Sequence, residues 1–286
     1  MRSRAGRPDA GNGRVPRGRK GSTMDLQLIG KTAFISGSTQ GIGYAVATML
    51  AREGVTVTLH GRDAAKLAAA VETLRREVPG SSVDGIAADF AVPEQVERLC
   101  AELADVDILI NNVGLFELKP FEDISAEEWR RYFEVNTLSG ALLAQRLMPA
   151  MLARGWGRIV FISSESGVNV PADMIHYGAS KAAMMAVGNG LAKLTRGTGV
   201  TVNSVLGGPT YSDGVAATVE GIAAATGQSV ADMKQAIIGA NQTSLLERFI
   251  EPEEIAAMVT FLASPHASAT NGSAVRVDGG VLTSVV

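Results

Sequence analysis

Apolar residues recur along this chain in two alternating patterns, from about residue 31 to the end. Short continuous runs such as TAFIS (32–36) and VDILIN (106–111) predict strands that are buried on both faces. Between such runs, apolar positions recur at helical spacing, as in AAKLAAAVETLRREV (64–78). Seven strands alternating with helices predict an α/β fold: one Rossmann-type doubly wound domain, with a mostly parallel seven-stranded sheet and helices on both faces.

The predicted elements keep this alternation down to the C-terminus. The longest helical patterns cover residues 125 to about 154 and about 175 to 197, and a further one covers 252–264. The strands are expected at 32–36, 55–59, 82–89, 106–111, 157–163, 200–206 and 273–279.

Residues 211–246 interrupt the alternation. The segment is rich in alanine, helical in composition, and lies between the sixth strand and the last helix. Ligands of open α/β sheets bind beyond the carboxyl ends of the strands. An insertion that leaves a strand at this edge is therefore expected to form a small helical lid over the substrate. The alternative is a surface helical hairpin that does not touch a ligand.

The first 23 residues differ in kind from the rest. They hold seven Lys and Arg side chains against one acid, Asp9, among Gly and Pro. This composition predicts a disordered basic tail, and an arm that binds a polyanion is the alternative. Residues 24–286 are then expected to form the single domain, with Met24 as a plausible start of the protein.

Charge, cysteine content and hydropathy argue against several classes of protein. A net charge of −3 argues against a nucleic-acid-binding surface on the body of the protein. The single cysteine, Cys100, excludes an internal disulfide and fits a reducing compartment, so we expect a cytoplasmic protein. No apolar run approaches the ~20 residues that cross a bilayer. His60, His266 and Cys100 lack the spacing of metal ligands, so no metal is expected.

A glycine-rich turn stands between the first strand and the first helix. The segment SGSTQGIG (36–43) has three glycines at this crossing. Glycine permits a tight turn and lets backbone N–H groups approach a diphosphate, which the helix N-terminus favours electrostatically. The strand–turn–helix setting predicts a nucleotide-binding turn. It is formed by Gly37, Ser38, Thr39, Gln40, Gly41, Ile42 and Gly43.

A tyrosine and a lysine lie four positions apart in YGASK (177–181), with only small residues between them. On a helix such positions share a face and lie about 5–6 Å apart. A free phenol titrates near ~10, and a nearby cation stabilises its charged form. We therefore expect Lys181 to lower the pKa of Tyr177 toward the range that suits proton transfer.

The G-x-x-x-G-x-G spacing of the turn, the segment NNVG (111–114) and YGASK together resemble the short-chain dehydrogenase/reductase family. The resemblance covers residues 30 to about 283, nearly all of the chain outside the basic tail.

This resemblance assigns a role to four side chains. It implies that Tyr177 is the general acid/base for hydride transfer to or from a carbonyl, and that Lys181 holds the nicotinamide ribose. It also implies that Ser164 orients the carbonyl oxygen and that Asn136 completes the catalytic set through a proton-relay water.

The end of the second strand bears on the choice of cofactor. In LHGRD, the strand-end positions hold His60 and Gly61 rather than the acid that binds the ribose of NAD, and Arg62 follows. A guanidinium suits a 2′-phosphate, while Asp63 is expected to cap the next helix. We therefore expect NADP(H), with NAD as the alternative, although Gln40 stands where NADP-using relatives often have Arg or Lys.

Further cofactor contacts are implied by position. The loop LGGPT after the sixth strand has Gly207 where relatives usually have proline, which leaves the rigidity of this loop open. The expected contacts are Asp89 and Phe90 at the adenine, Asn112 and Gly114 beside the adenine ribose, and Thr210 and Ser212 at the carboxamide.

Two charged or polar residues lie next to the predicted catalytic residues in the sequence. His176 precedes Tyr177 and is expected either to line the substrate cleft or to face solvent. Glu165 follows Ser164, and we expect a solvated loop carboxylate there rather than a substrate contact.

The resemblance implies an NADP(H)-dependent oxidoreductase that interconverts a secondary alcohol and a ketone. Two alternatives stay open: an epimerase or dehydratase that recycles its nicotinamide cofactor, and a non-catalytic NAD(P)-binding sensor or scaffold. The expected partner is a small carbonyl or alcohol substrate, not a nucleic acid or a membrane. The family also suggests a homotetramer or homodimer.

Overall fold

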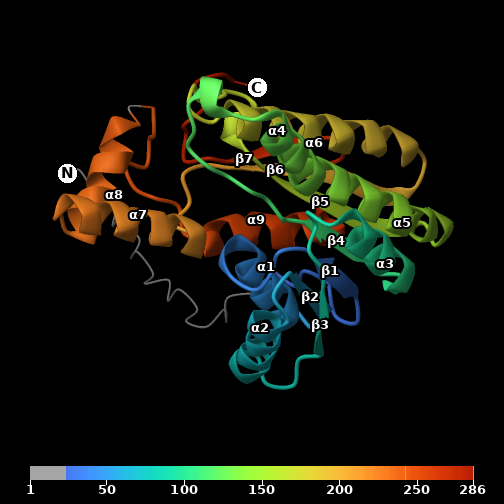
Figure 1. Ribbon diagram of the computed structural model, residues 1–286. Helices are drawn as coiled ribbons and strands as arrows, with labels where there is room; N and C mark the ends of the chain where they lie inside the picture. The colour runs from blue at the N-terminus through green and yellow to red at the C-terminus, as the bar shows by residue number, and fades with distance from the viewer. Residues whose placement is uncertain (1–23, 242, 286) are drawn as a thin grey trace, which may run out of the picture.

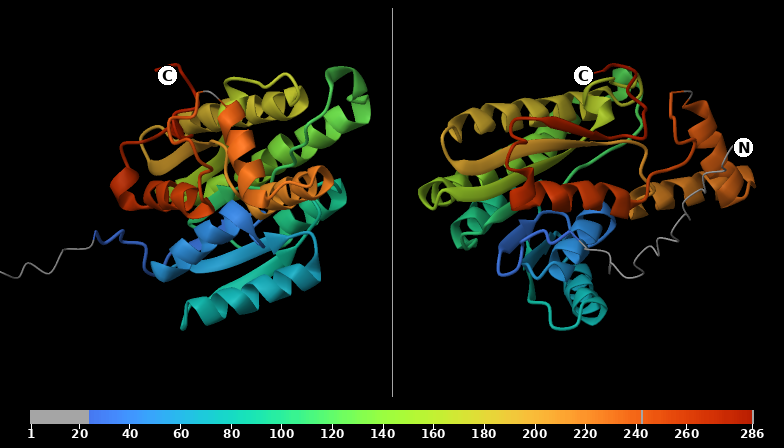
Figure 2. Two further views of the ribbon diagram at one scale, coloured as in Figure 1. Left: turned by 90° about the vertical axis from the view of Figure 1, so that its left-hand side faces the viewer. Right: turned by 180° about the vertical axis from the view of Figure 1, so that it is seen from behind.

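The computed structural model describes residues 24–241 and 243–285. A parallel sheet of seven strands, in the order β3-β2-β1-β4-β5-β6-β7, carries helices on both faces (Figure 1, Figure 2). The predicted Rossmann-type doubly wound fold is confirmed, while the basic tail predicted over residues 1–23 lies outside the described residues. The strands are β1 Thr32–Ile35, β2 Thr56–Gly61, β3 Val83–Ala87, β4 Ile108–Asn111, β5 Trp156–Ser164, β6 Gly199–Gly207 and β7 Ala274–Val277.

The strand order reverses next to β1. Phe34 of β1 lies opposite Thr58 of β2 on one side and opposite Leu109 of β4 on the other. In an open parallel sheet, a ligand binds in the crevice beyond the carboxyl ends of the strands at such a reversal. The ends of β1 and β4 therefore mark where the site is expected.

Each face of the sheet packs its own hydrophobic core. Helices α1, α2 and α9 cover one face, where Val46, Leu74 and Val259 are fully buried. Helices α3, α5 and α6 cover the other. Ile35 belongs to the first core and Phe34 to the second, which explains the continuous apolar runs in the strands. The helices are α1 Gly41–Arg52, α2 Ala64–Glu77, α3 Pro93–Glu102, α4 Ala126–Phe133, α5 Ser139–Ala153, α6 Ile175–Leu194, α7 Asp213–Thr226, α8 Val230–Ala240 and α9 Pro252–Ala263.

The helix predicted over 125–154 is not continuous. A capping box at Ser125 and Glu128 begins α4, and a π-helical segment at Glu134–Leu138 then separates α4 from α5. The side chain of Asn136, inside this segment, bonds the backbone of Leu115. Its partner is distant in sequence, so helical periodicity alone could not predict the interruption.

The segment predicted as a lid folds into α7 and α8, which lie at one end of the molecule (Figure 1). They pack a small core of their own, in which Val219, Met233 and Phe249 are buried. Asp213, the first residue of α7, accepts a hydrogen bond from the backbone N–H of Gly41, 2.7 Å away. The segment that holds α7 and α8 therefore contacts the glycine-rich turn directly.

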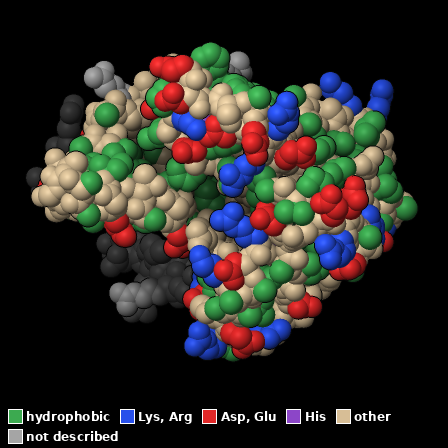
Figure 3. Space-filling model, viewed as in Figure 1, with side chains coloured by type: hydrophobic (Ala, Val, Ile, Leu, Met, Phe, Trp, Pro, Cys, Tyr) green, Lys and Arg blue, Asp and Glu red, His purple; other side chains and the backbone are tan. Residues whose placement is uncertain are grey.

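Basic and acidic side chains are interspersed over the face seen in Figure 3. Among the described helices, none is long and apolar enough to span a membrane. Within the described ranges, no group of three or more His, Cys, Asp and Glu side chains is placed to hold a metal ion.

Candidate active site

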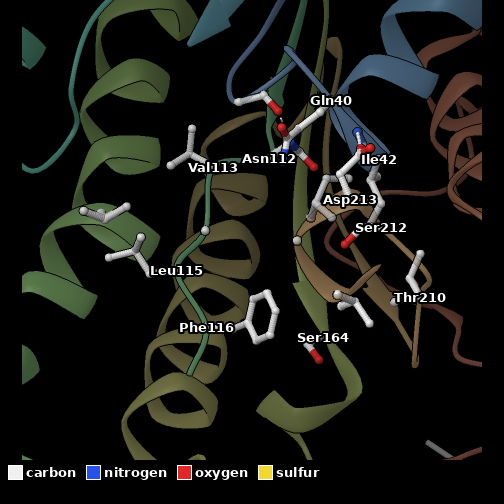
Figure 4. Close-up of a pocket in the computed structure, with 18 of the residues that line it drawn as sticks. Gln40, Ile42, Asn112, Val113, Leu115, Phe116, Ser164, Thr210, Ser212 and Asp213 are labelled. Atoms are coloured by element: carbon white, nitrogen blue, oxygen red, sulfur yellow. Dashed lines mark hydrogen bonds between the residues drawn. The ribbon is translucent and has the colours of Figure 1, made fainter. Parts of the chain in front are cut away.

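A cavity of about 730 Å³ opens along the carboxyl edge of the sheet. The glycine-rich turn, the ends of β2, β4, β5 and β6, and the start of α7 all contribute to its wall (Figure 4). Ser164, Tyr177 and Lys181 of the predicted catalytic set line this cavity, and Asn136 does not. Of the predicted cofactor contacts, all line it except Ser38 and Gly43.

Glycines shape the turn between β1 and α1. Gly37 and Gly41 have φ of +62° and +58°, in the region that other residues rarely adopt. A Cβ on Gly43 would lie 2.4 Å from the carbonyl oxygen of Gly37, so this position has no room for a side chain. Ser38 is buried beneath the turn, where its hydroxyl donates to Ile35 O at 2.7 Å. Ser38 and Gly43 therefore shape the turn from inside.

The open end of α1 suits an anion. In the described structure the side chain of its N-cap, Gln40, does not cap the helix. The first backbone N–H groups of a helix lack intrahelical acceptors and favour negative charge. The Asp213 carboxylate accepts a hydrogen bond from the backbone N–H of Gly41. A carboxylate thus accepts a hydrogen bond at this end of α1, where a cofactor diphosphate would find the same kind of N–H donor.

Asn112 fixes the turn against the central strand. Its side-chain Nδ2 donates to the carbonyl oxygens of Ser36 and Gly37, at 3.1 and 2.8 Å. Its backbone N–H donates to the Ser36 hydroxyl at 2.9 Å. Asn112 thus ties the glycine turn to the segment that follows β4, and it also lines the cavity.

The end of β2 carries the groups that would meet the adenine ribose. Arg62 and Lys66 both line the cavity. Asp63 caps α2, as predicted, by accepting from Ala65 N and Lys66 N, and these backbone hydrogen bonds hold its pKa below the usual range. Arg62 and Lys66 thus bring two basic side chains to this end of the cavity, which Asp63 also lines while its carboxylate accepts the N–H groups of α2.

His60 is a structural part of the turn that the sequence did not reveal. Its Nδ1 accepts from Gly37 N at 3.1 Å, and its ring lies 4.3 Å from that of Phe90, centroid to centroid. Burial lowers the pKa of His60 to about 4, so the ring is neutral and able to accept at neutral pH. His60 thus ties the glycine turn to the adenine wall that Phe90 and Asp89 were predicted to form.

Ser164, at the end of β5, and Tyr177 and Lys181, on α6, meet in the cavity. Lys181 is buried, and its Nζ donates to Ile162 O at 2.8 Å and lies 5.8 Å from the centre of the Tyr177 ring. A Cβ on Gly114 would lie 3.1 Å from Lys181 Nζ, so a residue with a side chain would crowd the amine.

The pKa of Tyr177 differs from the expectation. This pKa is raised to about 12, mainly by burial, with the charge of Glu165 acting in the same direction and the neighbouring Ser164 side chain in the opposite one. Burial also lowers the pKa of Lys181 to about 8. The prediction that Lys181 brings the pKa of the phenol toward neutrality is therefore wrong for the site as it stands, because burial is the largest cause of both shifts.

Asn136 lies behind the cavity wall. Its Oδ1 accepts from Leu115 N at 2.7 Å, and its Nδ2 donates to Leu115 O and to the Ser180 hydroxyl at 3.0 and 2.9 Å. The side chain thus joins the π-helical segment, the loop after β4 and α6.

The loop after β6 is held without the missing proline. Ile250 N donates to Pro209 O at 2.8 Å, and Tyr211 N donates to Ile250 O at 2.9 Å. A side chain at Gly208 would meet the backbone of Asp278 at 2.5 Å. This pairing answers the question of rigidity left open by Gly207 and presents Thr210 and Ser212 to the cavity.

Several residues lie elsewhere than the sequence suggested. His176 neither lines the cavity nor faces solvent: it is fully buried, with its ring 4.0 Å from that of Tyr132. Glu165 is a partly buried carboxylate of the cavity wall that accepts a short hydrogen bond from Ser164, so the expectation of a solvated group is wrong. Phe116 faces the same space, with its ring 6.5 Å from that of Tyr177 (Figure 4).

The fold and this cavity define a dinucleotide-binding enzyme. The family model described as short chain dehydrogenase matches residues 31–223, and the chain belongs to this family. It is accordingly an oxidoreductase that acts on CH–OH groups.

Relatives and solved structures agree with this membership. The chain is 42% identical over 266 residues to the uncharacterized oxidoreductase YvrD of Bacillus subtilis, covering 92% of this chain and 100% of that protein. It is 31% identical over 262 residues to the 3-oxoacyl-[acyl-carrier-protein] reductase FabG of Aquifex aeolicus, covering 90% and 100%. The crystal structure of L-sorbose reductase from Gluconobacter frateurii, complexed with NADPH and L-sorbose, matches with a TM-score of 0.85 and 32% identity, covering 92% and 100%.

Proposed function

We propose that this protein is an NADP(H)-dependent reductase that interconverts a ketone and a secondary alcohol. One observation carries the proposal: a single cavity joins Ser164, Tyr177 and Lys181 to Arg62 and Lys66. Two strands, β1 and β4, separate β2 from β5 in the sheet. The two sets therefore stand apart along the edge, with the glycine turn at the end of β1 between them, as an extended dinucleotide requires.

The catalytic residues divide the reaction between them. When bound, the nicotinamide supplies the hydride for reduction and accepts it for oxidation. Tyr177, whose pKa burial raises to about 12, is protonated at neutral pH and donates its proton to the substrate oxygen. The Ser164 hydroxyl orients that oxygen. Lys181 directs one N–H to Ile162 O and offers its remaining donors to the ribose.

Asn136 has a different part in this proposal. Its contacts to Leu115 and Ser180 support a role in holding the cavity wall and α6 in register. The proton-relay water implied by family resemblance stays a prediction.

The proposal of NADP(H) rests on charge. Arg62 and Lys66 face the cavity, while Asp63 is engaged by the N-terminus of α2. A similar protein, L-sorbose reductase, was solved with NADPH. We also keep three predictions from the sequence: the domain over 24–286 with its substrate lid, a homotetramer or homodimer, and a cytoplasmic location.

The substrate class is tested by following NADPH consumption with a panel of ketoses, simple ketones and 3-oxoacyl thioesters. We expect one class to consume NADPH and yield one alcohol per NADPH oxidised. Turnover of an alcohol or sugar without net cofactor consumption would instead indicate an epimerase or dehydratase. NADPH binding without reaction on any of these substrates would contradict the proposal and favour a sensor.

A further inference from the structure

The hydroxyl of Ser164 has two partners on its own segment. Its Oγ accepts from the backbone N–H of Ser166 at 3.1 Å, and it donates a short hydrogen bond to Oε2 of Glu165. Ser164 is only 6% exposed, so these protein groups and the cavity contents are the available partners. Glu165 belongs to the 3₁₀ turn Glu165–Gly167, which packs against α6.

A hydroxyl has one proton to donate and two lone pairs to accept with. The Ser166 N–H occupies one lone pair of Ser164. An ionised carboxylate can only accept, so an ionised Glu165 takes the one proton of Ser164. The Ser164 oxygen then has one free lone pair, and it has no proton left to donate to the substrate carbonyl oxygen.

A neutral Glu165 reverses this arrangement. Its carboxylic O–H donates to the remaining lone pair of Ser164, and the Ser164 proton becomes free to point into the cavity. The substrate carbonyl oxygen then receives two hydrogen bonds, one from Ser164 and one from Tyr177. No atom is lost or gained in this change beyond the single proton on Glu165.

We propose that Glu165 is a positioning residue whose neutral form turns the Ser164 hydroxyl toward the substrate carbonyl and whose ionised form turns it away. The inference rests on the proposed ketone reduction. It adds one requirement to that reaction, namely that the Glu165 carboxyl group is protonated.

The surroundings of Glu165 support this behaviour. Burial raises the pKa of Glu165, against the lowering effect of its hydrogen bonds from Ser164 and Ser166. The titratable and charged groups that line the cavity with it are Tyr177 and Lys181 on α6, Arg131 on α4 and Asp213 on α7, and, at the cofactor end, His60, Arg62, Asp63, Lys66 and Asp89.

A second effect acts in the same direction. The negative charge of Glu165 raises the pKa of Tyr177. A neutral Glu165 therefore also makes the phenol a stronger acid, and reduction gains from both changes.

The test is the pH profile of kcat for ketone reduction, in the wild type and in Glu165→Gln. Since only the neutral form is active, kcat of the wild type should fall about tenfold per pH unit above the pKa of Glu165. Glutamine cannot ionise and can donate through its amide, so Glu165→Gln should lack this decline and exceed the wild type at alkaline pH. Asp173→Asn, which removes an exposed carboxylate three residues before His176, is the control and should keep the wild-type profile.

Ser164→Ala separates this role from a purely electrostatic one. The loss of one donor to a developing oxyanion costs about 10²–10³-fold in kcat. On the Ser164→Ala background, Glu165→Gln should change the pH profile much less than in the wild type, because the hydroxyl that it directs is gone and only its electrostatic effect on Tyr177 remains. A full effect of Glu165→Gln on that background would overturn the proposal, as would a wild-type decline that persists in Glu165→Gln.

A readout without turnover keeps this inference separate from the proposed function. Infrared difference spectra, wild type against Glu165→Gln, report the protonated carboxyl band of Glu165 as pH is varied. We expect the band to persist above the ordinary titration range near ~4.3. A Glu165 that ionises in that ordinary range overturns the inference, even if the protein proves to be an NADPH-dependent reductase. Failure of every ketone, with the raised titration still present, would count against the proposed function alone.

Discussion

Lys181→Met should make the protein more stable at pH 7 while removing its activity. Lys181 is 4% exposed, and burial lowers its pKa from 10.5 to about 8. Each pKa unit corresponds to about 1.4 kcal/mol, so keeping this amine in the folded protein costs about 3 kcal/mol at pH 7. The hydrogen bond to Ile162 O, which methionine cannot make, offsets about 1–3 kcal/mol of this cost. A small net gain in stability is expected.

The dependence on pH gives the sharper test. The folded-state pKa lies below the unfolded one, so the cost is present in full below pH 8 and is relieved as pH rises toward 10.5. Between pH 7 and pH 9 the stability of the wild type should rise by roughly 1 kcal/mol relative to Lys181→Met.

The assay is urea unfolding of both proteins at pH 7, 8 and 9, at matched protein concentration. Lys193→Met on the same helix is the control: Lys193 is exposed, and its replacement should change stability by less than about 0.5 kcal/mol at every pH. A gap between Lys181→Met and the wild type that stays constant or widens with pH would refute the account of a buried, destabilising lysine.

Three further variants test the cofactor end of the cavity. Arg62→Ala should raise the apparent KM for NADPH about tenfold or more and leave that for NADH unchanged; an equal effect on both cofactors would remove the assignment of the 2′-phosphate site. Asp213→Asn should lower the dissociation constant of NADPH, because the carboxylate competes with the diphosphate for Gly41 N, and weaker binding would show that Asp213 assists instead. Gly43→Ala should abolish NADPH binding in a chain that still folds, since its Cβ would lie 2.4 Å from Gly37 O; tight binding by this variant, measured by fluorescence titration, would contradict the packing argument.

Local motifs were readable from the sequence because their geometry is local. The glycine turn lies within eight consecutive residues, and Tyr177 and Lys181 lie one helical turn apart on α6. The order of strands and helices was equally readable, since the continuous apolar runs reflect strands such as β1 that face a core on each side.

Contacts between segments that are far apart in the chain could not be predicted from the sequence. Asp213 and Gly41 are 172 positions apart, and the π-helical segment depends on Asn136 reaching Leu115, 21 positions away. The burial of His176 depends on α4, which packs against α6.

The direction in which the pKa of Tyr177 shifts could not be predicted from the sequence either. A lysine four residues from a tyrosine suggested a lowered phenol pKa. The spacing reveals the nearby cation, but it does not reveal how far the two groups are withdrawn from water. In the structure Tyr177 is half-buried in the cavity wall and Lys181 is buried, and burial is the largest cause of both shifts. Glu165 was misjudged for the same reason, since its partly buried position depends on the packing of its turn against α6.

The central claim is that the Tyr177 hydroxyl delivers the proton that accompanies hydride transfer from NADPH. The most direct measurement compares wild type with Tyr177→Phe in single-turnover ketone reduction and in NADPH binding. The account predicts that the variant binds NADPH as tightly as the wild type and reduces the ketone at least about 10²-fold more slowly. A Tyr177→Phe variant that reduces the ketone at the wild-type rate would contradict it.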